Sequence, residues 1–237
     1  MFPITPWTIL MNATLDGDEP GRKALEKLCR TYRDPVVSFL RIRGYNQHEA
    51  EDATQSLFLK LLQNRIWKKA DPSRGKFRSF LLTILQRLIA TEAERARCQK
   101  NGGGAEHIAW DESADAMAAA AVSEPEPCPD FDYQWALRTL RAALTRVEAR
   151  WVERGREKQF AVLRKFLPGT QRVPSYAEVA PELGVTEENA RAAVCRLRDE
   201  LSEALRDEVK ATVSSEAELK AEMAYLLRIL ASPRTAL

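Results

Sequence analysis

The chain has 237 residues, 45% of them hydrophobic and 30% charged, with a formal net charge of +2 at pH 7. A chain of this length usually forms one or two domains and has enough apolar residues to bury a core. Ala, Leu, Arg and Glu predominate and runs of β-branched residues are nearly absent, which predicts an all-α fold. The near-neutral total excludes a general electrostatic affinity for nucleic acid as the basis of function.

Metal, disulfide, enzyme and membrane functions find no support in the sequence. The four cysteines are scattered without paired spacing, and His48 and His107 are the only histidines. We therefore expect no metal site and no cofactor. No Gly-rich phosphate loop or nucleophile–base arrangement indicates an enzyme. The apolar first residues lack a basic segment and a cleavage pattern, and no later stretch is long enough to cross a bilayer, so we expect a reduced, cytoplasmic protein.

The first half is expected to hold a flexible lead-in, residues 1–20, and a helical domain, residues 21–100. Apolar residues at intervals of three or four predict a helix over residues 21–43, and Gly44 ends it. Pro35 interrupts this pattern, which predicts a kink or a new helix start there.

A second helix is expected to begin after Asn46, which is the candidate cap. Its exposed face keeps Glu51, Asp52 and Gln55 within about one turn of each other. Acids near a helix start also favour the macrodipole, and that account explains them without any function.

The next segment, residues 68–80, is a loop in which aromatic residues alternate with cations. The cations are Lys68, Lys69, Arg74, Lys76 and Arg78. Such a loop can stack Phe77 or Phe80 on unpaired bases while the cations hold phosphates. Equally, the two rings can anchor the loop to the core, which is the more common role in an isolated loop. A further helix is predicted over residues 79–99, with Arg87, Thr91, Glu94 and Arg95 facing outward.

Residues 101–134 contain eight acids and no Lys or Arg. Because helical periodicity is weak there, we expect a mostly extended, flexible acidic linker between two domains. The simplest role of such a segment is that of a solvated spacer.

The second domain is expected over residues 135–210, and it contains a candidate helix-turn-helix at residues 175–201. Ser175 and Glu178 form a capping box, Gly184 is the hinge, and Thr186 caps the second helix. The pattern also predicts that Val185 is buried. Pro181 is awkward, because inside a helix it removes a backbone donor and costs roughly a few kcal/mol.

The outward face of the second helix carries the residues that would meet a DNA major groove. They are Glu188, Asn189, Arg191, Ala192, Cys195, Arg196 and Arg198. This pattern suits a DNA-reading helix-turn-helix, and it suits equally a plain helical hairpin with a solvated face. Residues 211–237 are expected to add a C-terminal helix that caps the second domain, with a built-in regulator or a polymerase contact as the other possibilities.

Three blocks of the chain resemble extracytoplasmic-function (ECF, group IV) sigma factors of the sigma-70 family. The segment HEAEDATQSLFLKLL, residues 48–62, is similar to their second region through Ala50-Glu51-Asp52, Gln55, Leu57 and Phe58. The segment beginning FRSFLLTIL, residues 77–104, resembles the adjoining part that melts and reads the promoter −10 element. The helix-turn-helix resembles the fourth region, which reads the −35 element, and the blocks occur in the family's order.

The resemblance implies two small helical domains and a role for each block. Glu51, Asp52, Gln55 and Phe58 would bind the clamp coiled coil of the largest subunit of core RNA polymerase. The basic loop from Lys68 to Arg78 would hold the displaced strand, and the outward residues of the next helix, Arg87 to Arg95, would present −10 bases. The outward face of the helix-turn-helix would read the −35 element, and the linker would thread the polymerase channel.

Departures from the family pattern leave the recognised sequence open. Phe80 stands where the family usually has Trp, and Arg87 and Thr91 stand where Asn and Asp are common. Glu187 and Glu188 also make the expected −35 face less basic than usual, so we expect attachment to polymerase to strengthen DNA binding.

The sequence thus favours a promoter-specificity factor that binds core polymerase and promoter DNA, without a membrane partner and with an anti-sigma factor or another regulator as a possible partner. Two alternatives remain open. An autonomous helix-turn-helix regulator would bind a palindromic duplex tightly by itself. A helical protein-interaction adaptor would fit the near-neutral charge but would leave the clustered basic loop unexplained.

Overall fold

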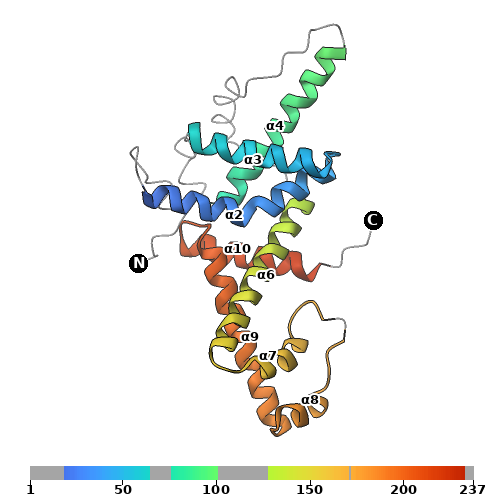
Figure 1. Ribbon diagram of the computed structural model, residues 1–237, viewed down its shortest axis with the longest axis vertical. Helices are drawn as coiled ribbons and strands as arrows, with labels where there is room; N and C mark the ends of the chain where they lie inside the picture. Colours follow the sequence, from blue (N-terminus) through green and yellow to red (C-terminus); the bar gives the residue numbers. More distant parts are fainter. Residues whose placement is uncertain (1–18, 65–75, 101–127, 171, 233–237) are drawn as a thin grey trace. The chain divides into compact units, whose positions relative to one another are not determined.

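A computed structural model describes residues 19–64, 76–100, 128–170 and 172–232 of the chain. All regular structure in these ranges is helical, which confirms the predicted all-α fold (Figure 1). The helices are α2 (Glu19–Ile42), α3 (Gln47–Asn64), α4 (Phe77–Lys100), α6 (Pro129–Glu153), α7 (Glu157–Leu163), the 3₁₀ helix η4 (Arg164–Phe166), α8 (Tyr176–Leu183), α9 (Glu187–Lys210) and α10 (Glu216–Ala231). They form two compact units, one of residues 1–138 and 209–237 and one of residues 139–208.

The first unit begins with α2 and α3, joined by a tight turn. Gly44 in this turn has a φ of 98°, a backbone conformation that side chains with a Cβ rarely adopt. Asn46 caps α3 as predicted, since its side chain accepts from the Glu49 N–H at 3.0 Å and the Glu49 carboxylate accepts from the Asn46 N–H at 2.7 Å. Of the two options predicted at Pro35, a new helix start is excluded because α2 continues through this residue, and the kink stays a prediction.

The core of the first unit gathers side chains from α2, α3, α4, the start of α6 and α10. Its largest fully buried members are Trp135, Tyr32, Phe39, Phe77, Phe131, Leu28, Leu57 and Leu61. Rings meet edge to face in this core, with Tyr32 and Phe77 centred 5.0 Å apart and Phe39 and Phe131 6.0 Å apart.

The C-terminal helix α10 belongs to this first unit. Its inner residues Leu219 and Leu226 are fully buried there. The expectation that the C-terminal helix would cap the second domain was therefore wrong. The reason is a set of polar contacts between α10, α4 and α6, whose partners lie far apart in the sequence.

The second unit packs α9 against the later part of α6, with α7, η4 and α8 beside them. Trp151 Nε1 donates to Glu200 at 3.0 Å, and Arg154 pairs with the same carboxylate at 3.0 Å. Arg146 of α6 pairs with Glu208 near the C-terminal end of α9. The inner face of α9 is buried at Ala190, Val194, Leu197 and Leu201, which recur at helical spacing.

The helix-turn-helix has the predicted local geometry. Ser175 and Glu178 form the capping box, Gly184 has a φ of 65°, and the Thr186 hydroxyl accepts from the Asn189 N–H at 3.3 Å. α8 accommodates Pro181 without ending before Leu183. The prediction for Val185 was wrong: it is 41% exposed, and Val179 from the middle of α8 is buried instead.

The linker prediction is corrected at its end. α6 begins at Pro129, so residues 129–134 are helical and not part of an extended tether. Residues 101–127 of the predicted linker lie outside the described ranges.

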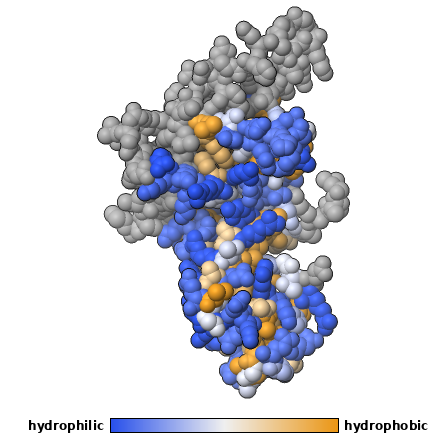
Figure 2. Space-filling model, viewed as in Figure 1, coloured by the Kyte–Doolittle hydropathy of each residue, from blue (hydrophilic) through white to orange (hydrophobic). Residues whose placement is uncertain are grey.

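Figure 2 shows a mostly hydrophilic face in which apolar residues gather only in small groups.

Candidate functional site

The outer face of α3 carries the residues that the sequence assigned to polymerase binding. Asp52 and Gln55 are exposed, whereas Glu51 and Phe58 are half-buried. Leu59 beside them is 47% exposed. We call these five residues the α3 face. It combines two apolar side chains with three polar ones, which is the composition of a protein-binding surface.

Hydrogen bonds hold one edge of the α3 face in place. The Glu51 carboxylate accepts from Gln47 one turn earlier and lies 3.7 Å from Arg33 of α2. The ends of these side chains are therefore restrained before any partner binds, which reduces the entropy lost on binding.

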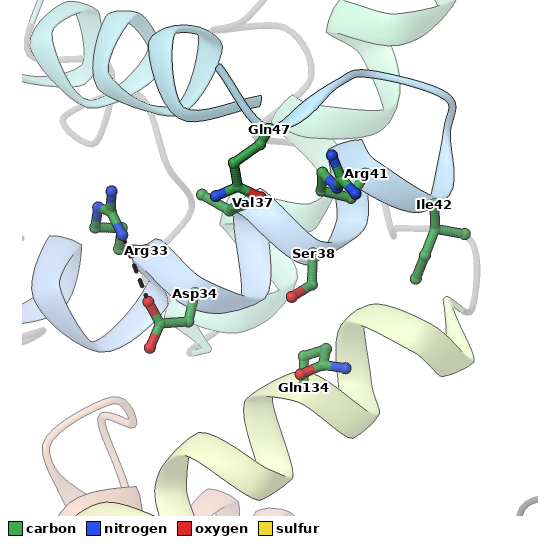
Figure 3. Close-up of a pocket in the computed structure, with 8 residues that line it drawn as sticks. All are labelled: Arg33, Asp34, Val37, Ser38, Arg41, Ile42, Gln47 and Gln134. Carbon is green, nitrogen blue, oxygen red and sulfur yellow. Dashed lines mark ion pairs between the residues drawn. The ribbon is translucent and has the colours of Figure 1, made fainter. Parts of the chain in front are cut away.

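A polar groove of about 470 Å³ lies beside this edge (Figure 3). Residues of α2 line most of it, and Gln47 from the start of α3 and Gln134 from α6 complete it. Arg33 and Asp34 form an ion pair at 3.7 Å within the groove. The lining has two guanidinium groups, one carboxylate and no nucleophile–base pair, so it offers contacts to a partner and no evident catalytic chemistry.

The start of α4 holds the three residues of the predicted strand-binding loop that the structure describes. Phe77 is fully buried, Arg78 is 8% exposed and Lys76 is half-buried. The Phe77 N–H lies in the first turn of α4, where backbone donors have no acceptor within the helix. It donates instead to the Thr212 carbonyl at 3.2 Å. Phe77 is thus a core anchor in this structure, which is one of the two roles considered for it.

Arg78 is the centre of a buried ionic cluster. Its Nε donates to Glu222 Oε1 of α10 at 2.6 Å, and its Nη1 pairs with Asp132 of α6. Glu222 Oε2 also lies 3.1 Å from Lys76 Nζ. Tyr225 closes the cluster, since its hydroxyl donates to Asp132 at 2.6 Å. We call these five residues the Arg78 cluster.

Aromatic rings cover the guanidinium of Arg78 on two sides. Its Cζ lies 4.7 Å from the ring centre of Tyr225 and 5.2 Å from that of Trp135. Such cation–π contacts favour the charged form of a desolvated arginine.

The cluster shifts the ionisation of its members. Burial alone would raise the pKa of Glu222, but the charges and hydrogen bonds of Arg78 and Lys76 more than offset this and hold that pKa below its usual value. Burial would lower the pKa of Arg78, and the Glu222 carboxylate outweighs burial and raises it. Burial and the hydrogen bond to Asp132 raise the pKa of Tyr225 to about 12, so its hydroxyl remains a donor at neutral pH.

The remaining residues predicted to meet the −10 region fall in three groups. Lys68, Lys69 and Arg74 lie outside the described ranges. Thr91, Glu94 and Arg95 belong to α4, although their side chains lie outside the described set. Arg87 is half-buried on the same helix.

The helix-turn-helix places most of its predicted reading residues on one accessible surface of α9. Ala192 is half-buried, and the other six are exposed: Glu188, Asn189, Arg191, Cys195, Arg196 and Arg198. Internal contacts already orient two of the arginines. Arg191 lies over the Tyr176 ring, 5.2 Å from its centre, and Arg198 donates to the Phe166 carbonyl at 3.2 Å.

Sequence reasoning missed Asp132, Glu222 and Tyr225 of the Arg78 cluster. Asp132 was assigned to the linker, and the tail was read only for its apolar spacing. One signal was present: Glu222 lies three residues after Leu219 and four before Leu226, which puts it on the buried face of the helix. An acid at such a position requires a cationic partner.

Two further findings concern the described residues alone. They include no group of three or more His, Cys, Asp or Glu side chains that could hold a metal ion. None of their helices is both long and apolar enough to cross a membrane.

Part of the first unit is similar to a known protein family. Residues 28–98 match the family model of sigma-70 region 2. Searches of curated proteins and of solved structures found no match. The match covers most of α2, all of α3 and α4 up to residue 98, and it includes the α3 face and the start of α4. Residues 28–98 are therefore similar to sigma-70 region 2, a domain of transcription initiation factors.

Proposed function

We propose that the chain is a sigma factor of the extracytoplasmic-function type that directs core RNA polymerase to promoters and assists their melting in the cytoplasm. The observation that carries this proposal is the region 2 match over residues 28–98, followed in the same chain by a helix-turn-helix with exposed cations. A regulator such as an anti-sigma factor would set when the protein is active.

The α3 face is the proposed contact with the clamp coiled coil of the largest polymerase subunit. Its restrained Glu51 edge and its partly exposed Phe58 and Leu59 suit a helical partner, because apolar side chains supply affinity and the polar ones among them supply orientation. The groove beside Gln47 would extend this contact with further polar groups.

α9 is the proposed reader of the −35 element, and its exposed polar groups are Glu188, Asn189, Arg191, Arg196 and Arg198. Arginine and lysine contacts to phosphate give salt-dependent affinity, and the few side chains that reach base edges give preference. Because Glu187 and Glu188 occupy the first turn of this helix, the phosphate contacts are few. Strong promoter binding therefore depends on attachment to polymerase.

The α4 helix and the basic loop before it are the proposed −10 reader. The residues concerned are Lys68, Lys69, Arg74, Lys76, Phe77 and Arg78 in and after the loop, and Arg87, Thr91, Glu94 and Arg95 along α4. Cations that hold phosphates and rings that stack on unpaired bases are the chemistry that a separated strand requires.

The first test of the proposal is co-elution with bacterial core polymerase in gel filtration. We expect the wild-type chain to co-elute and Asp52→Ala/Gln55→Ala to lose about tenfold or more in affinity, since both are exposed polar side chains of the α3 face. Glu26→Ala is the control, because it removes an exposed carboxylate from α2 whose pair with Arg30 is worth under about 1 kcal/mol.

The second test is run-off transcription from a promoter library with core polymerase and the purified chain. Transcripts that depend on the chain would give the recognised sequence. Failure to bind any core polymerase, together with tight duplex binding by the chain alone, would favour the autonomous regulator over the sigma factor.

A further inference from the structure

The Arg78 cluster places an acidic helix where a nucleic-acid strand would be expected. If the proposed function holds, Lys76, Phe77 and Arg78 belong to the segment that holds the displaced DNA strand. In this structure Phe77 is fully buried, Arg78 is 8% exposed, and Lys76 and Arg78 share the carboxylate of Glu222. The residues at the start of α4 are therefore not available to DNA while α10 is in place.

The contacts that Glu222 makes are those that a phosphate group would make. Two oxygens of one anion meet Arg78 Nε at 2.6 Å and Lys76 Nζ at 3.1 Å. Arginine and lysine bind carboxylate and phosphate through the same charge-assisted hydrogen bonds. The rings of Tyr225 and Trp135 over the guanidinium resemble the aromatic surfaces on which unpaired bases stack.

We propose that α10 is an acidic latch, in which Glu222 occupies the position of a DNA phosphate between Lys76 and Arg78 and must leave before the start of α4 can hold single-stranded DNA. This inference rests on the proposed function and adds a means of regulation within the chain. It explains why an otherwise apolar inner helix face carries a glutamate that is 1% exposed.

The attachment of α10 is limited enough for such a movement. Leu219 and Leu226 are its fully buried apolar residues, whereas Ala217, Ala221 and Ala224 of its outer face are exposed. α10 also carries its own N-cap, since the Ser215 side chain accepts from the Glu218 N–H at 3.2 Å. The start of the helix therefore does not depend on the Arg78 cluster for its backbone hydrogen bonds.

The first test measures binding of the free, full-length chain to a fluorescein-labelled, single-stranded 20-mer of mixed sequence, by fluorescence anisotropy at low salt. A latch that leaves about 1–10% of molecules open lowers the apparent affinity about 10- to 100-fold. We therefore expect Glu222→Gln to bind at least about tenfold more tightly than the wild type. Glu203→Gln, which changes the same charge at an exposed position of α9, should stay within about twofold of the wild type.

A second variant shows whether the gain passes through the proposed site. Adding Lys76→Gln to Glu222→Gln should remove most of the gain, because Lys76 is the cation that loses its pair with Glu222, whereas Arg78 keeps its pair with Asp132. If Glu222→Gln keeps its helical circular dichroism and still binds within twofold of the wild type, the latch is refuted.

Hydrogen exchange of the wild-type chain decides the question without any substitution. Peptides that cover residues 219–229 should exchange slowly in the free chain and faster in its complex with core polymerase and single-stranded DNA. Unchanged exchange of these peptides in a chain that does co-elute with polymerase overturns the latch alone. A chain that never co-elutes with polymerase overturns the proposed function instead.

Discussion

Replacing Arg78 by methionine is the most direct probe of the buried cluster. The side chains of Asp132 and Glu222 are 4% and 1% exposed, so Arg78→Met leaves two carboxylates with little access to water. Removing one partner of a buried ion pair usually costs about 3–5 kcal/mol, because the remaining charge is uncompensated. Lys76 still neutralises part of the charge on Glu222, so we expect the free energy of unfolding to fall by about 3 kcal/mol.

The assay is urea denaturation at pH 7, with hydrogen exchange of α4 peptides to report on the first unit separately from the second. Arg138→Met is the matched control. Its pair with Asp34 at 3.4 Å joins a half-buried arginine to an exposed carboxylate that keeps its access to water, so its loss should cost under about 1 kcal/mol. A loss below about 1 kcal/mol for Arg78→Met as well would refute the reasoning, since it would mean that water compensates the two acids.

The pH dependence of the same variant has a defined sign. In the wild type the pKa of Glu222 is lowered, so its contribution to stability is present above the usual glutamate pKa and is lost as the pH falls through the folded-state value. In Arg78→Met, burial without the arginine favours the protonated form of Glu222. The free energy of unfolding of the variant should therefore fall less than that of the wild type on acidification from pH 7 to pH 4. The difference in free energy of unfolding between the two proteins should become smaller over this range.

Three further predictions concern the second unit, each measured as a change in thermal or urea stability. Ser175→Ala removes the side-chain acceptor of the capping box with Glu178 and should cost about 1 kcal/mol, with faster hydrogen exchange at the start of α8. Gly184→Ala should cost about 1–2 kcal/mol because its φ of 65° is left-handed; the added methyl itself meets open space, so a loss well above this range would contradict backbone strain as the cause. Trp151→Phe removes the indole donor to Glu200 and should cost about 1 kcal/mol or slightly more, and an unchanged stability would mean that water replaces this bond.

The local features of the fold could be predicted because the residues that fix them are close in sequence. Asn46, Ser175 and Thr186 each lie three residues before the backbone N–H that they accept from, so their caps follow from spacing alone. The buried stripe of α9 follows in the same way from its helical period.

The features that could not be predicted join distant segments. Arg78 and Glu222 are separated by 144 positions, and the residues around each of them do not indicate which residue is its partner. The same applies to Phe77, whose position among cations suits both base stacking and anchoring until its tertiary neighbours are known. Asp132 was read as part of an acidic spacer because composition describes a segment's average and not the one residue that turns inward.

The first unit contains residues that precede the second unit in the sequence and residues that follow it. The order of synthesis therefore affects how the first unit folds. Residues 139–208 form a continuous stretch and can fold as soon as they have left the ribosome, whereas the first unit also requires residues 209–237. Until residues 209–231 are made, the buried start of α4 lacks its contacts with the Thr212 carbonyl and the Glu222 carboxylate. A nascent chain thus carries an incomplete first unit with exposed apolar surface, and this period is when chaperones or a binding partner have access to it.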